Sequence, residues 1–397
     1  MPSLAPTQPR LSLTNRFPLA SLPLRTIKGE PKNYVTGFAQ IAAVIKRAAQ
    51  DVGFDLCGIA PANDSPELNH FPAWIDAGRA GEMKYLESRT EEGSLKRSSL
   101  AHVAPWARSV VVCAINYNAD YPYSTEFRDS NRGWISRYAW SRQDYHKAVL
   151  QRVKQVENAL RSAAASSTQE SSDTLITRSY VDTGAIVERV YAKYAGIGWI
   201  GKNTCIINQK NGSWLFLGVI LTSLALEPDL PAPDRCGTCT RCIEACPTEA
   251  LIAPYQLDSN LCIAYHTIEK RGAIPEEMRE GIGRHVFGCD ICQDVCPWNR
   301  KAPTSVVTEL EPRRELVNPA LDWLAELNEE EFLRTFRGSP LRRAKRGGLR
   351  RNAVIAMGNS ADRRFLPLLE KLASDEDEIV ADSARWARDQ LQKTQSP

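Results

Sequence analysis

The first half of the chain alternates between helical and strand-like hydrophobic patterns. Over residues 37–60 the apolar positions predict an amphipathic helix, a glycine turn and a short strand. Residues 109–118 and 214–224 are apolar and rich in β-branched side chains, which is typical of buried strands. Between them, residues 144–165 have a long helical pattern that ends in a polar loop. Strands mixed with helices predict an α+β domain over residues 36–225.

The second half divides into a cysteine-rich segment and a helical segment. A proline-rich linker leads into the cysteine region, which we place at residues 226–300. After an acidic connector, Ala, Leu and Ile recur at helical spacing in two or three short segments separated by "GNSAD" and "SDED" turns. This pattern predicts a HEAT-like α-helical domain over residues 301–397.

Composition and charge limit the possible partners. The chain has 397 residues, 43% of them hydrophobic, and its formal charge is 50 basic minus 47 acidic residues, or +3. Since the molecule is not a polycation, nucleic-acid binding would need a local basic patch. No apolar run reaches the roughly 18 to 20 residues that cross a bilayer, so no membrane span is expected. Residues 1–35, rich in Pro, Ser, Leu and Arg, are interpreted as a disordered extension or an early start site rather than a transit peptide.

The cysteines are concentrated in one short region. Eight of the eleven fall between residues 236 and 296. In a large chain without a secretion signal, such clustering indicates metal binding in a reducing compartment rather than disulfides. We therefore expect a cytoplasmic metalloprotein.

The run "CGTCTRCIEACP" has the C-x2-C-x2-C-x3-C-P spacing of bacterial ferredoxins. In that motif the first three cysteines bind one 4Fe-4S cluster and the fourth, here Cys246, binds the other. By the same exchange, Cys296, which precedes a proline, completes the first cluster. The predicted ligands of cluster 1 are therefore Cys236, Cys239, Cys242 and Cys296.

The second run, "CDICQDVCP", lacks one cysteine of the ferredoxin pattern. Cys262 stands alone between the two motifs and can supply the missing thiolate, so cluster 2 is predicted to use Cys246, Cys262, Cys289 and Cys292. Zinc sites and free core thiols are the alternatives, but zinc knuckles usually lack the trailing Cys-Pro. The other three cysteines lie in apolar or strand-like surroundings and are expected to be buried small hydrophobic side chains: Cys57, Cys113 and Cys205.

Asp182, in "YVDTG", is the most prominent polar residue upstream of the cysteines. It follows an apolar strand pattern and precedes Thr-Gly and a helix. A carboxylate there can act as a proton donor if dry surroundings raise its pKa. It can equally be the N-cap of the following helix. The nearby "GIGWIGKN" follows a helix instead of a strand and has no acidic residue at the expected distance, so we do not interpret it as a dinucleotide site.

Two further segments carry aromatic and basic residues. Residues 137–153 can line a pocket, bind phosphate or simply begin a solvated helix. Within them, "DYHKAV" matches half of the D-x-H-x-x-G signature that donates a histidine to cobalamin, but Val149 replaces the glycine, and we reject His146 as a cobalt ligand. Between Arg334 and Arg351 there are eight Lys or Arg and no acid, which indicates a nucleic-acid footprint or, alternatively, a solvated helix face.

In combination, these motifs resemble the epoxyqueuosine reductase family over residues 38–390. The resemblance is carried by "YVDTG", "GIGWIGKN", "CGTCTRCIEACPTEAL", "CIAYHTIEKRGAIPEE", "FGCDICQDVCPWN" and "GSPLRRAKRGGLRRNAVIAMGN". It implies a cobalamin-dependent oxidoreductase with two 4Fe-4S clusters that converts epoxyqueuosine in the tRNA wobble position to queuosine. It also implies a cobalamin-binding α+β domain, a ferredoxin-like module and a HEAT-like C-terminus.

The resemblance further implies roles for individual residues. Asp182 matches the family's proton donor, and desolvation is expected to keep it protonated near neutral pH. The implied cobalamin-lining residues are Arg97, Ser136, Asp182, Ile206, Leu217, Ile263, Cys289, Asp290, Ile291 and Cys292. Basic residues expected to bind tRNA are Arg342, Arg343, Lys345, Arg346, Arg350 and Arg351. Cobalamin would be held without a histidine on cobalt, and a ferredoxin or flavodoxin would supply electrons to a monomeric enzyme.

Two alternatives to this function remain at this stage. One is another corrinoid and iron-sulfur reductase, such as a reductive dehalogenase, although those usually carry a twin-arginine export signal and no "RR" precedes an apolar stretch at this N-terminus. The other is a non-catalytic electron carrier or tRNA-binding scaffold. Retention of cobalamin would argue against the carrier and the scaffold.

Overall fold

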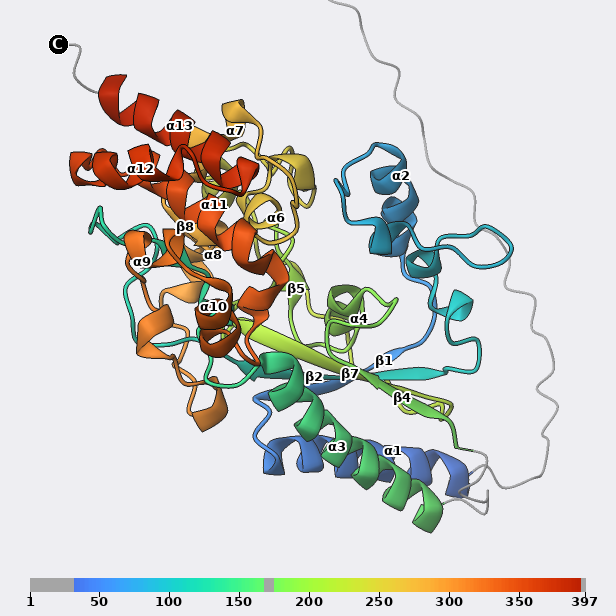
Figure 1. Cartoon of the computed structure of the whole chain (residues 1–397). Coiled ribbons are helices and arrows are strands. Elements are labelled where there is room, and N and C mark those ends of the chain that lie inside the picture. Colours follow the sequence, from blue (N-terminus) through green and yellow to red (C-terminus); the bar gives the residue numbers. More distant parts are fainter. Residues whose placement is uncertain (1–31, 168–174, 394–397) are drawn as a thin grey trace, which may run out of the picture.

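A computed structural model describes residues 32–167 and 175–393 of the chain. The fold is organised around one four-stranded antiparallel sheet with the strand order β1-β2-β7-β4 (Figure 1). Its strands are β1 (Leu56–Pro61), β2 (Ser109–Asn116), β4 (Thr177–Tyr180) and β7 (Leu215–Thr222). The two predicted buried strands are thus confirmed as β2 and β7. The interpretation of residues 1–35 falls almost entirely outside the described residues, as does most of the polar loop after the long helix.

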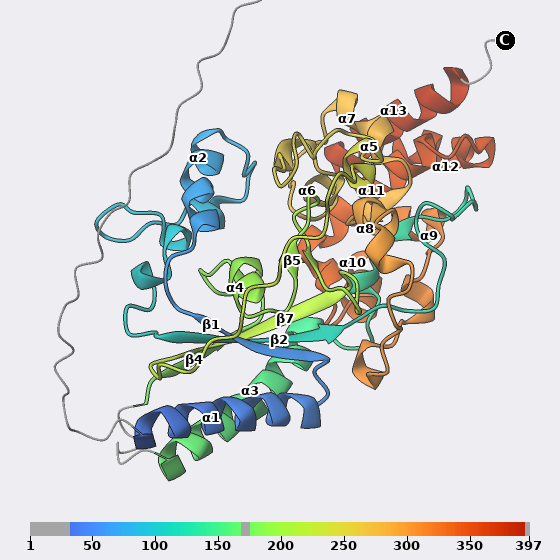
Figure 2. The same cartoon turned by 180° about the vertical axis from the view of Figure 1, so that it is seen from behind.

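Helices cover both faces of this sheet. The predicted amphipathic helix and the predicted long helix are confirmed as α1 (Lys32–Asp51) and α3 (Tyr145–Ser167), which lie together on one face (Figures 1 and 2). On the other face, α4 (Glu188–Tyr194) packs against β1 and β2. Because both faces are covered, all eight residues of β2 are buried, which explains its nearly continuous apolar sequence.

The rest of the chain is built from short elements above the sheet. The helix α2 (His70–Asp76) precedes β2, and a small hairpin is formed by β5 (Trp199–Ile200) and β6 (Ile206–Ile207). The cysteine region contains α5 (Arg241–Glu244), α6 (Ile263–Ile268), α7 (Glu276–Ile282), β8 (His285–Phe287) and α8 (Ile291–Asp294). Figure 2 shows α5, α6 and α8 near the β5 end of the sheet domain. None of the helices among the described residues is long and apolar enough to span a bilayer.

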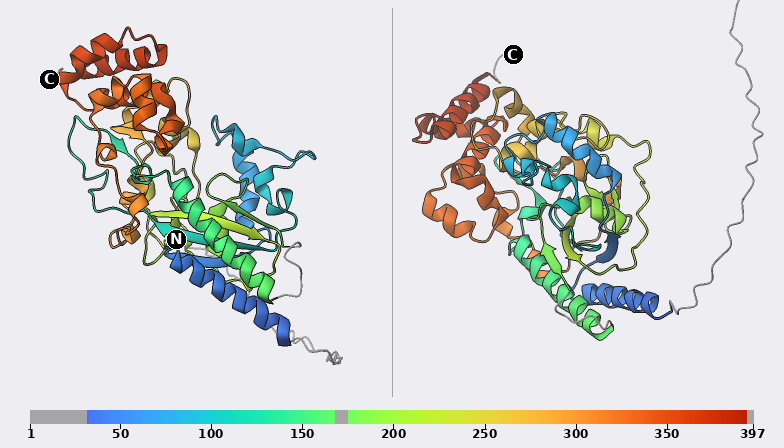
Figure 3. Two further views of the ribbon diagram at one scale, coloured as in Figure 1. Left: turned by 60° about the horizontal axis from the view of Figure 1, so that its bottom comes forward. Right: turned by 90° about the vertical axis from the view of Figure 1, so that its right-hand side faces the viewer.

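The C-terminal segment is helical, as predicted. It consists of α9 (Leu321–Ala325), α10 (Glu329–Thr335), α11 (Lys345–Gly358), α12 (Leu366–Leu372) and α13 (Glu378–Lys393). The helix α11 packs against both α9 and α13, and the expected "GNSAD" and "SDED" turns separate the last three helices (Figure 3). Gly358 allows the close packing of α11 on α13, because a Cβ there would come within 2.8 Å of the Ala387 backbone.

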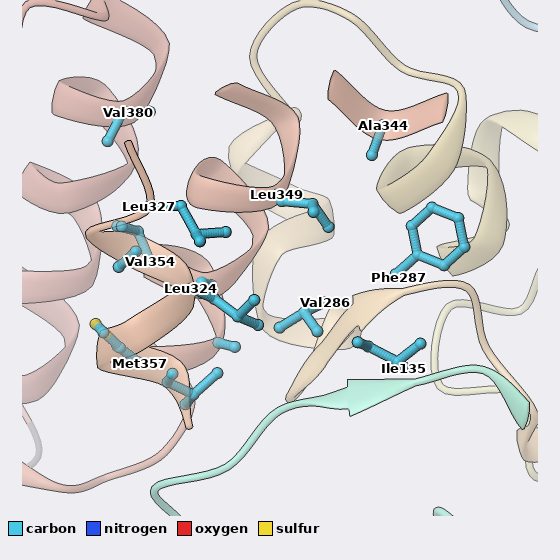
Figure 4. Close-up of a cluster of buried hydrophobic side chains, with 14 of the residues drawn as sticks. Ile135, Val286, Phe287, Leu324, Leu327, Ala344, Leu349, Val354, Met357 and Val380 are labelled. Atoms are coloured by element: carbon cyan, nitrogen blue, oxygen red, sulfur yellow. The ribbon is translucent and has the colours of Figure 1, made fainter. Parts of the chain in front are cut away.

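One core joins all three predicted segments. The strand β3 (Trp134–Ile135) lies between β2 and α3 in the sequence, yet it pairs in parallel with β8 of the cysteine region. Around this pair the C-terminal helices bury a continuous set of side chains (Figure 4), among them Ile135, Val286, Phe287, Leu324, Leu349 and Met357. The pairing fixes the cysteine region against the segment that precedes α3.

Candidate active site and iron-sulfur centres

Asp182 stands just beyond the end of β4, in a left-handed backbone conformation with φ 55°. The hydroxyl of Tyr145 donates a hydrogen bond of 2.7 Å to its carboxylate. Nε2 of His146 lies 3.8 Å from the same carboxylate oxygen, and the Asp182 side chain is 68% exposed. The N-cap interpretation is wrong, because α4 begins only at Glu188 and its N-cap is Val187.

His146 connects Asp182 to a second carboxylate. Its Nδ1 lies 2.8 Å from Oδ1 of Asp144, while Nε2 faces Asp182. The ring is held by stacking on Tyr145, with 4.0 Å between the ring centroids, and Tyr145 in turn stacks on Phe216 of β7 at 4.3 Å. The start of α3 therefore presents three side chains to the Asp182 loop: the carboxylate of Asp144, the phenol of Tyr145 and the imidazole of His146. The sequence analysis considered His146 only as a cobalt ligand and did not identify this role.

The protonation state of Asp182 differs from the expectation. Desolvation by the surrounding chain raises the pKa of its carboxyl, but the facing imidazole of His146 and the hydrogen bond from Tyr145 outweigh it and leave the pKa below the usual value. Desolvation lowers the pKa of His146, yet the hydrogen bond to Asp144 and the nearby Asp182 carboxylate raise it to about 9. In the protein alone, the proton of this pair therefore resides on His146 at neutral pH, and the prediction that Asp182 itself is protonated is wrong for this state.

Glu188 is a second carboxyl that the sequence analysis missed. Burial and, to a lesser extent, the charge of Asp182 raise its pKa to about 7. Its Oε1 atom is buried and has no hydrogen-bond partner among the described residues. The only sequence signal was its position as the first residue of the helix after Asp182. Together with the exposed Asp182 carboxylate, Glu188 leaves polar atoms at this site that the chain itself does not satisfy.

Arg97 holds the Asp182 loop in place. Its guanidinium donates to the carbonyls of Gly184, at 3.1 Å, and Tyr85, at 2.7 Å. The same guanidinium lies 5.7 Å from the centroid of the Tyr85 ring, and that of Arg343 lies 5.3 Å from it. Tyr85 is 46% exposed. Arg97, which is predicted to line the cofactor, and Arg343, which is predicted to bind tRNA, therefore both lie against the ring of Tyr85.

Ser136 and Asp290 have an internal structural role. The buried Asp290 carboxylate accepts hydrogen bonds from Trp134 Nε1 at 3.0 Å, Ser136 Oγ at 2.8 Å and the Arg137 amide at 2.8 Å. Side-chain contact with a cofactor would have to break these bonds. Of the other predicted lining residues, Ile206 and Ile263 are buried and the remainder are half-buried: Leu217, Cys289, Ile291 and Cys292. The cofactor contacts of all these residues stay predictions.

The first predicted set of cluster ligands comes together in the fold. Burial and, after it, the thiols of Cys236 and Cys239 raise the pKa of Cys242. Burial likewise raises the pKa of Cys296 to about 11, with Cys236 and Cys242 among its neighbours. Cys236 and Cys296 also share a small apolar cluster with Trp199 of the hairpin. The four thiols, from two distant motifs, therefore lie in one region of the fold, and their binding of a single cluster stays a prediction.

The second predicted set is also assembled. Burial and the neighbouring thiols of Cys262 and Cys246 raise the pKa of Cys289. The thiol of Cys292 is a neighbour of both Cys289 and Cys262. In the described residues no three His, Cys, Asp or Glu side chains stand close enough to share one metal ion. Cys205 is also a neighbour of Cys262 and Cys292, so the choice of four ligands for cluster 2 stays a prediction. Eight cysteines at this spacing have the donor chemistry that two four-iron clusters require.

The three remaining cysteines behave differently from one another. Cys113 of β2 is buried, as expected, and its sulfur lies 3.8 Å from that of Cys57 on β1. Cys57 and Cys205 are only half-buried, and the thiol of Cys205 is a neighbour of that of Cys292. The expectation of burial is therefore confirmed for Cys113 and wrong for the other two.

The basic run is only partly a surface patch. Arg351 is 1% exposed and donates to the carbonyls of His266 at 2.7 Å, Gly272 at 2.6 Å and Lys270 at 3.0 Å. Arg350 is buried as well. It donates to the Ala325 carbonyl at 2.8 Å and to the Asp375 carboxylate at 3.0 Å. The prediction that these two arginines bind tRNA is contradicted by their burial, since both guanidiniums hold the C-terminal helices in place.

Four predicted tRNA residues stay accessible at the start of α11. Arg342 and Lys345 are exposed. Arg343 is half exposed and pairs with Glu269, and Arg346 pairs with Glu329 at 3.1 Å. The accessible surface is therefore smaller and less positive than the sequence run suggests.

Comparison with known proteins agrees with this site. A family model described as epoxyqueuosine reductase QueG, DUF1730, matches residues 97–183, and a 4Fe-4S double cluster binding domain matches residues 235–299. The chain is 38% identical over 349 residues to epoxyqueuosine reductase of Xanthomonas campestris pv. campestris, covering 87% of this chain and 95% of the relative. It is 36% identical over 352 residues to that of Escherichia coli, covering 88% and 89%. The chain belongs to the epoxyqueuosine reductase family.

Solved structures of epoxyqueuosine reductases share the fold. A selenomethionine-labelled epoxyqueuosine reductase matches with a TM-score of 0.79 at 30% identity, covering 89% of this chain and 91% of the other. An epoxyqueuosine reductase bound to an epoxyqueuosine-modified tRNA-Tyr stem loop matches with a TM-score of 0.76 over the same shares, at 30% identity. The Bacillus subtilis enzyme, solved with its catalytic aspartate loop swung out of the active site, also has a TM-score of 0.76 at 30% identity, covering 89% of this chain and 91% of the other. The family uses cobalamin and two 4Fe-4S clusters.

Proposed function

We propose that this protein reduces the epoxide of epoxyqueuosine at the wobble position of tRNA to the alkene of queuosine. The observation that carries the proposal is the proton network of Asp182, Tyr145 and His146 on a chain that also has eight cysteines at ferredoxin-like spacing. Removing the epoxide oxygen as water consumes two electrons and two protons. The cysteine sets hold the electron carriers, and the Asp182 network holds protons.

Cobalamin, when bound, would supply the strongly reducing, nucleophilic cobalt that no side chain can provide. The residues that would hold it include Arg97, Leu217 and Ile291, all half-buried near the Asp182 loop or the second cysteine motif. The exposed Asp182 carboxylate and the partnerless Glu188 oxygen support a bound group that covers this site. The absence of a glycine at Val149 fits cobalamin held without His146 on cobalt.

Asp182 delivers a proton to the epoxide oxygen, and His146 is the source of that proton. At neutral pH the imidazole is protonated and its Nε2 faces the Asp182 carboxylate. Covering the site with cofactor and substrate removes water from Asp182, which disfavours its charged form and draws the proton from His146 onto the carboxylate. In a relative, the catalytic aspartate lies on a loop that can leave the active site. The position of Asp182 on the loop after β4 supports the same role here.

The tRNA-binding surface comprises the four accessible basic residues Arg342, Arg343, Lys345 and Arg346. Arg343 reaches Tyr85 beside Arg97 and so links this surface to the Asp182 loop. Single-stranded anticodon bases are recognised by stacking on aromatic rings and guanidinium planes. The half-exposed Tyr85 and its two arginines supply such a platform next to the reacting nucleotide.

The remaining assignments complete the proposal. Residues 36–225 form the cobalamin-binding domain, residues 226–300 the ferredoxin-like domain, and residues 301–397 a HEAT-like domain that carries the tRNA surface. A reduced ferredoxin or flavodoxin delivers electrons, and the enzyme works as a monomer in the cytoplasm. The half-buried cysteines of the first motif, Cys236, Cys239 and Cys242, support electron entry from a protein donor.

The test is a single-enzyme assay. The protein is loaded with cobalamin and iron-sulfur clusters, reduced, and incubated with tRNA bearing epoxyqueuosine, and the digested nucleosides are analysed by mass spectrometry. Queuosine is the expected product. A fully loaded enzyme that forms none contradicts the proposal. Cobalamin that stays bound during purification, seen by its visible absorption, excludes a mere electron carrier or scaffold.

A further inference from the structure

The turn between β5 and β6, residues 201–205 ("GKNTC"), touches both iron-sulfur sites. It is held tightly: the Gly201 amide donates to the Cys205 carbonyl at 2.8 Å, and the Thr204 amide donates to the Gly201 carbonyl at 2.8 Å. Thr204 is left-handed, with φ 65°. A Cβ at Gly201 would come within 2.4 Å of the Ile207 side chain, so only glycine fits there. The turn therefore presents its side chains in a defined arrangement.

Lys202 points from this turn to the first cluster site. Its Nζ donates to the carbonyls of Gly237 at 2.7 Å and Cys239 at 3.0 Å, which belong to the ligand loop of cluster 1. No ion pair among the described residues includes Lys202. Its positive charge is thus directed at cluster 1 without a neutralising carboxylate.

Asn203 anchors the turn to the second cluster site. Its buried amide donates to the Cys292 carbonyl at 3.2 Å and accepts from the Cys205 amide at 3.2 Å. Because Cys292 is a predicted ligand of cluster 2, this hydrogen bond fixes the turn between the two cluster sites. Lys202 is therefore held in place with its charge directed at cluster 1.

We propose that Lys202 raises the reduction potential of cluster 1. The cluster takes up one electron on reduction and becomes more negative. A nearby cation stabilises the reduced form, which raises the reduction potential. The inference rests on the cluster-binding part of the proposed function, and it requires no tRNA, so its failure is distinct from a failure of epoxide reduction.

The experiment is an EPR-monitored redox titration of the cluster-loaded protein, combined with iron analysis. Lys202→Met is expected to lower the potential of one EPR signal by about a tenfold change in the reduction equilibrium, or about 59 mV for one electron, and to leave the other signal unshifted. Lys202→Gln, which keeps an N–H donor without the charge, is expected to shift the same signal by a similar amount. The matched control is Lys210→Met in the turn after β6, whose side chain makes no hydrogen bond to a cluster loop in the described residues.

Several results would overturn this assignment. An unchanged potential in Lys202→Met, or an equal shift in Lys210→Met, would show that Lys202 has no specific electrostatic role. Equal shifts of both signals would contradict an action on one cluster. If Lys202→Met loses iron, the titration of Lys202→Gln decides, and an unshifted potential in that variant would reject the role of the charge.

Discussion

The Tyr145 hydroxyl donates a 2.7 Å hydrogen bond to Asp182, although the two residues are 37 positions apart in the sequence. The contact exists because α3 starts beside the end of β4, where both elements pack on β7. Together with His146, Tyr145 keeps the Asp182 carboxylate charged and oriented in the protein without its cofactor. The acid of the reaction is therefore a small network of residues, and its parts can be tested separately.

Asp182→Asn should abolish turnover without removing either cofactor. The amide keeps the shape of the side chain and can still hydrogen-bond Tyr145, but it cannot donate a carboxyl proton. A general acid contributes about 10²- to 10⁴-fold to the rate, so a loss of at least about 100-fold in single-turnover queuosine formation is expected. Iron content and cobalamin absorption should match the unmodified protein, as should those of the control Asp51→Asn at the end of α1. An active Asp182→Asn enzyme would refute the assignment.

The stability contribution of His146 should disappear at alkaline pH. Its pKa in the folded protein, about 9, lies above the ordinary value of 6.5, so the stabilisation is complete below pH 6.5 and is lost as the pH rises through 9. The melting temperature of the unmodified protein should therefore exceed that of His146→Gln by more at pH 6.5 than at pH 9.5. His70→Gln, at an exposed site, is the control. A difference independent of pH would show that His146 is not charged in the folded state.

Local patterns explain why much of the fold could be predicted. The helices α1 and α3 and the strands β2 and β7 each carry their own periodicity, and the cysteine spacing specifies which thiols share a cluster because a short loop can supply three ligands at once. The Cys262 assignment followed from counting ligands, and the fold brings that residue to Cys246 and Cys289.

Features that depend on distant contacts could not be predicted. The β3–β8 pairing joins two very short strands separated by about 150 residues, too short to show any period. In "LRRAKRGGLRR" nothing in the letters distinguishes the buried Arg351 from the exposed Arg342, because only the packing of α11 on α6 and α7 decides which side is covered. The lowered pKa of Asp182 likewise depends on Tyr145 and His146 at the start of α3, which are distant from Asp182 in the sequence.

Cys262→Ala should remove one cluster and leave the other. Cys262 is the predicted fourth ligand of cluster 2, and cluster 1 draws all its ligands from other cysteines. Iron analysis should show about half the iron of the unmodified protein, and one of the two EPR signals should be lost. Cys57→Ala should retain all the iron. Full iron content in Cys262→Ala would mean that another residue completes cluster 2.

Replacing the buried Arg351 should lower the stability of the protein much more than replacing the exposed Arg342. Arg351→Ala leaves the buried carbonyls of His266, Lys270 and Gly272 without a donor. An unsatisfied buried group costs about 1–3 kcal/mol, so a loss of roughly 3 kcal/mol or more in the free energy of unfolding is expected. Urea denaturation followed by circular dichroism measures it. Arg342→Ala, at an exposed position, should change that stability by less than about 0.5 kcal/mol.

Binding of tRNA should depend on the exposed basic residues. Arg342→Ala and Lys345→Ala each remove one accessible phosphate contact, so each should weaken binding and flatten the plot of log affinity against log salt by about 0.7, the value for a single-stranded contact. With four accessible basic residues, the unmodified protein should have a slope of about −3. Fluorescence anisotropy with a labelled anticodon stem loop, at several salt concentrations, measures both quantities. If the slope stays the same in both variants, then Arg342 and Lys345 do not neutralise phosphates of the tRNA. The tRNA would then bind to another surface of the protein.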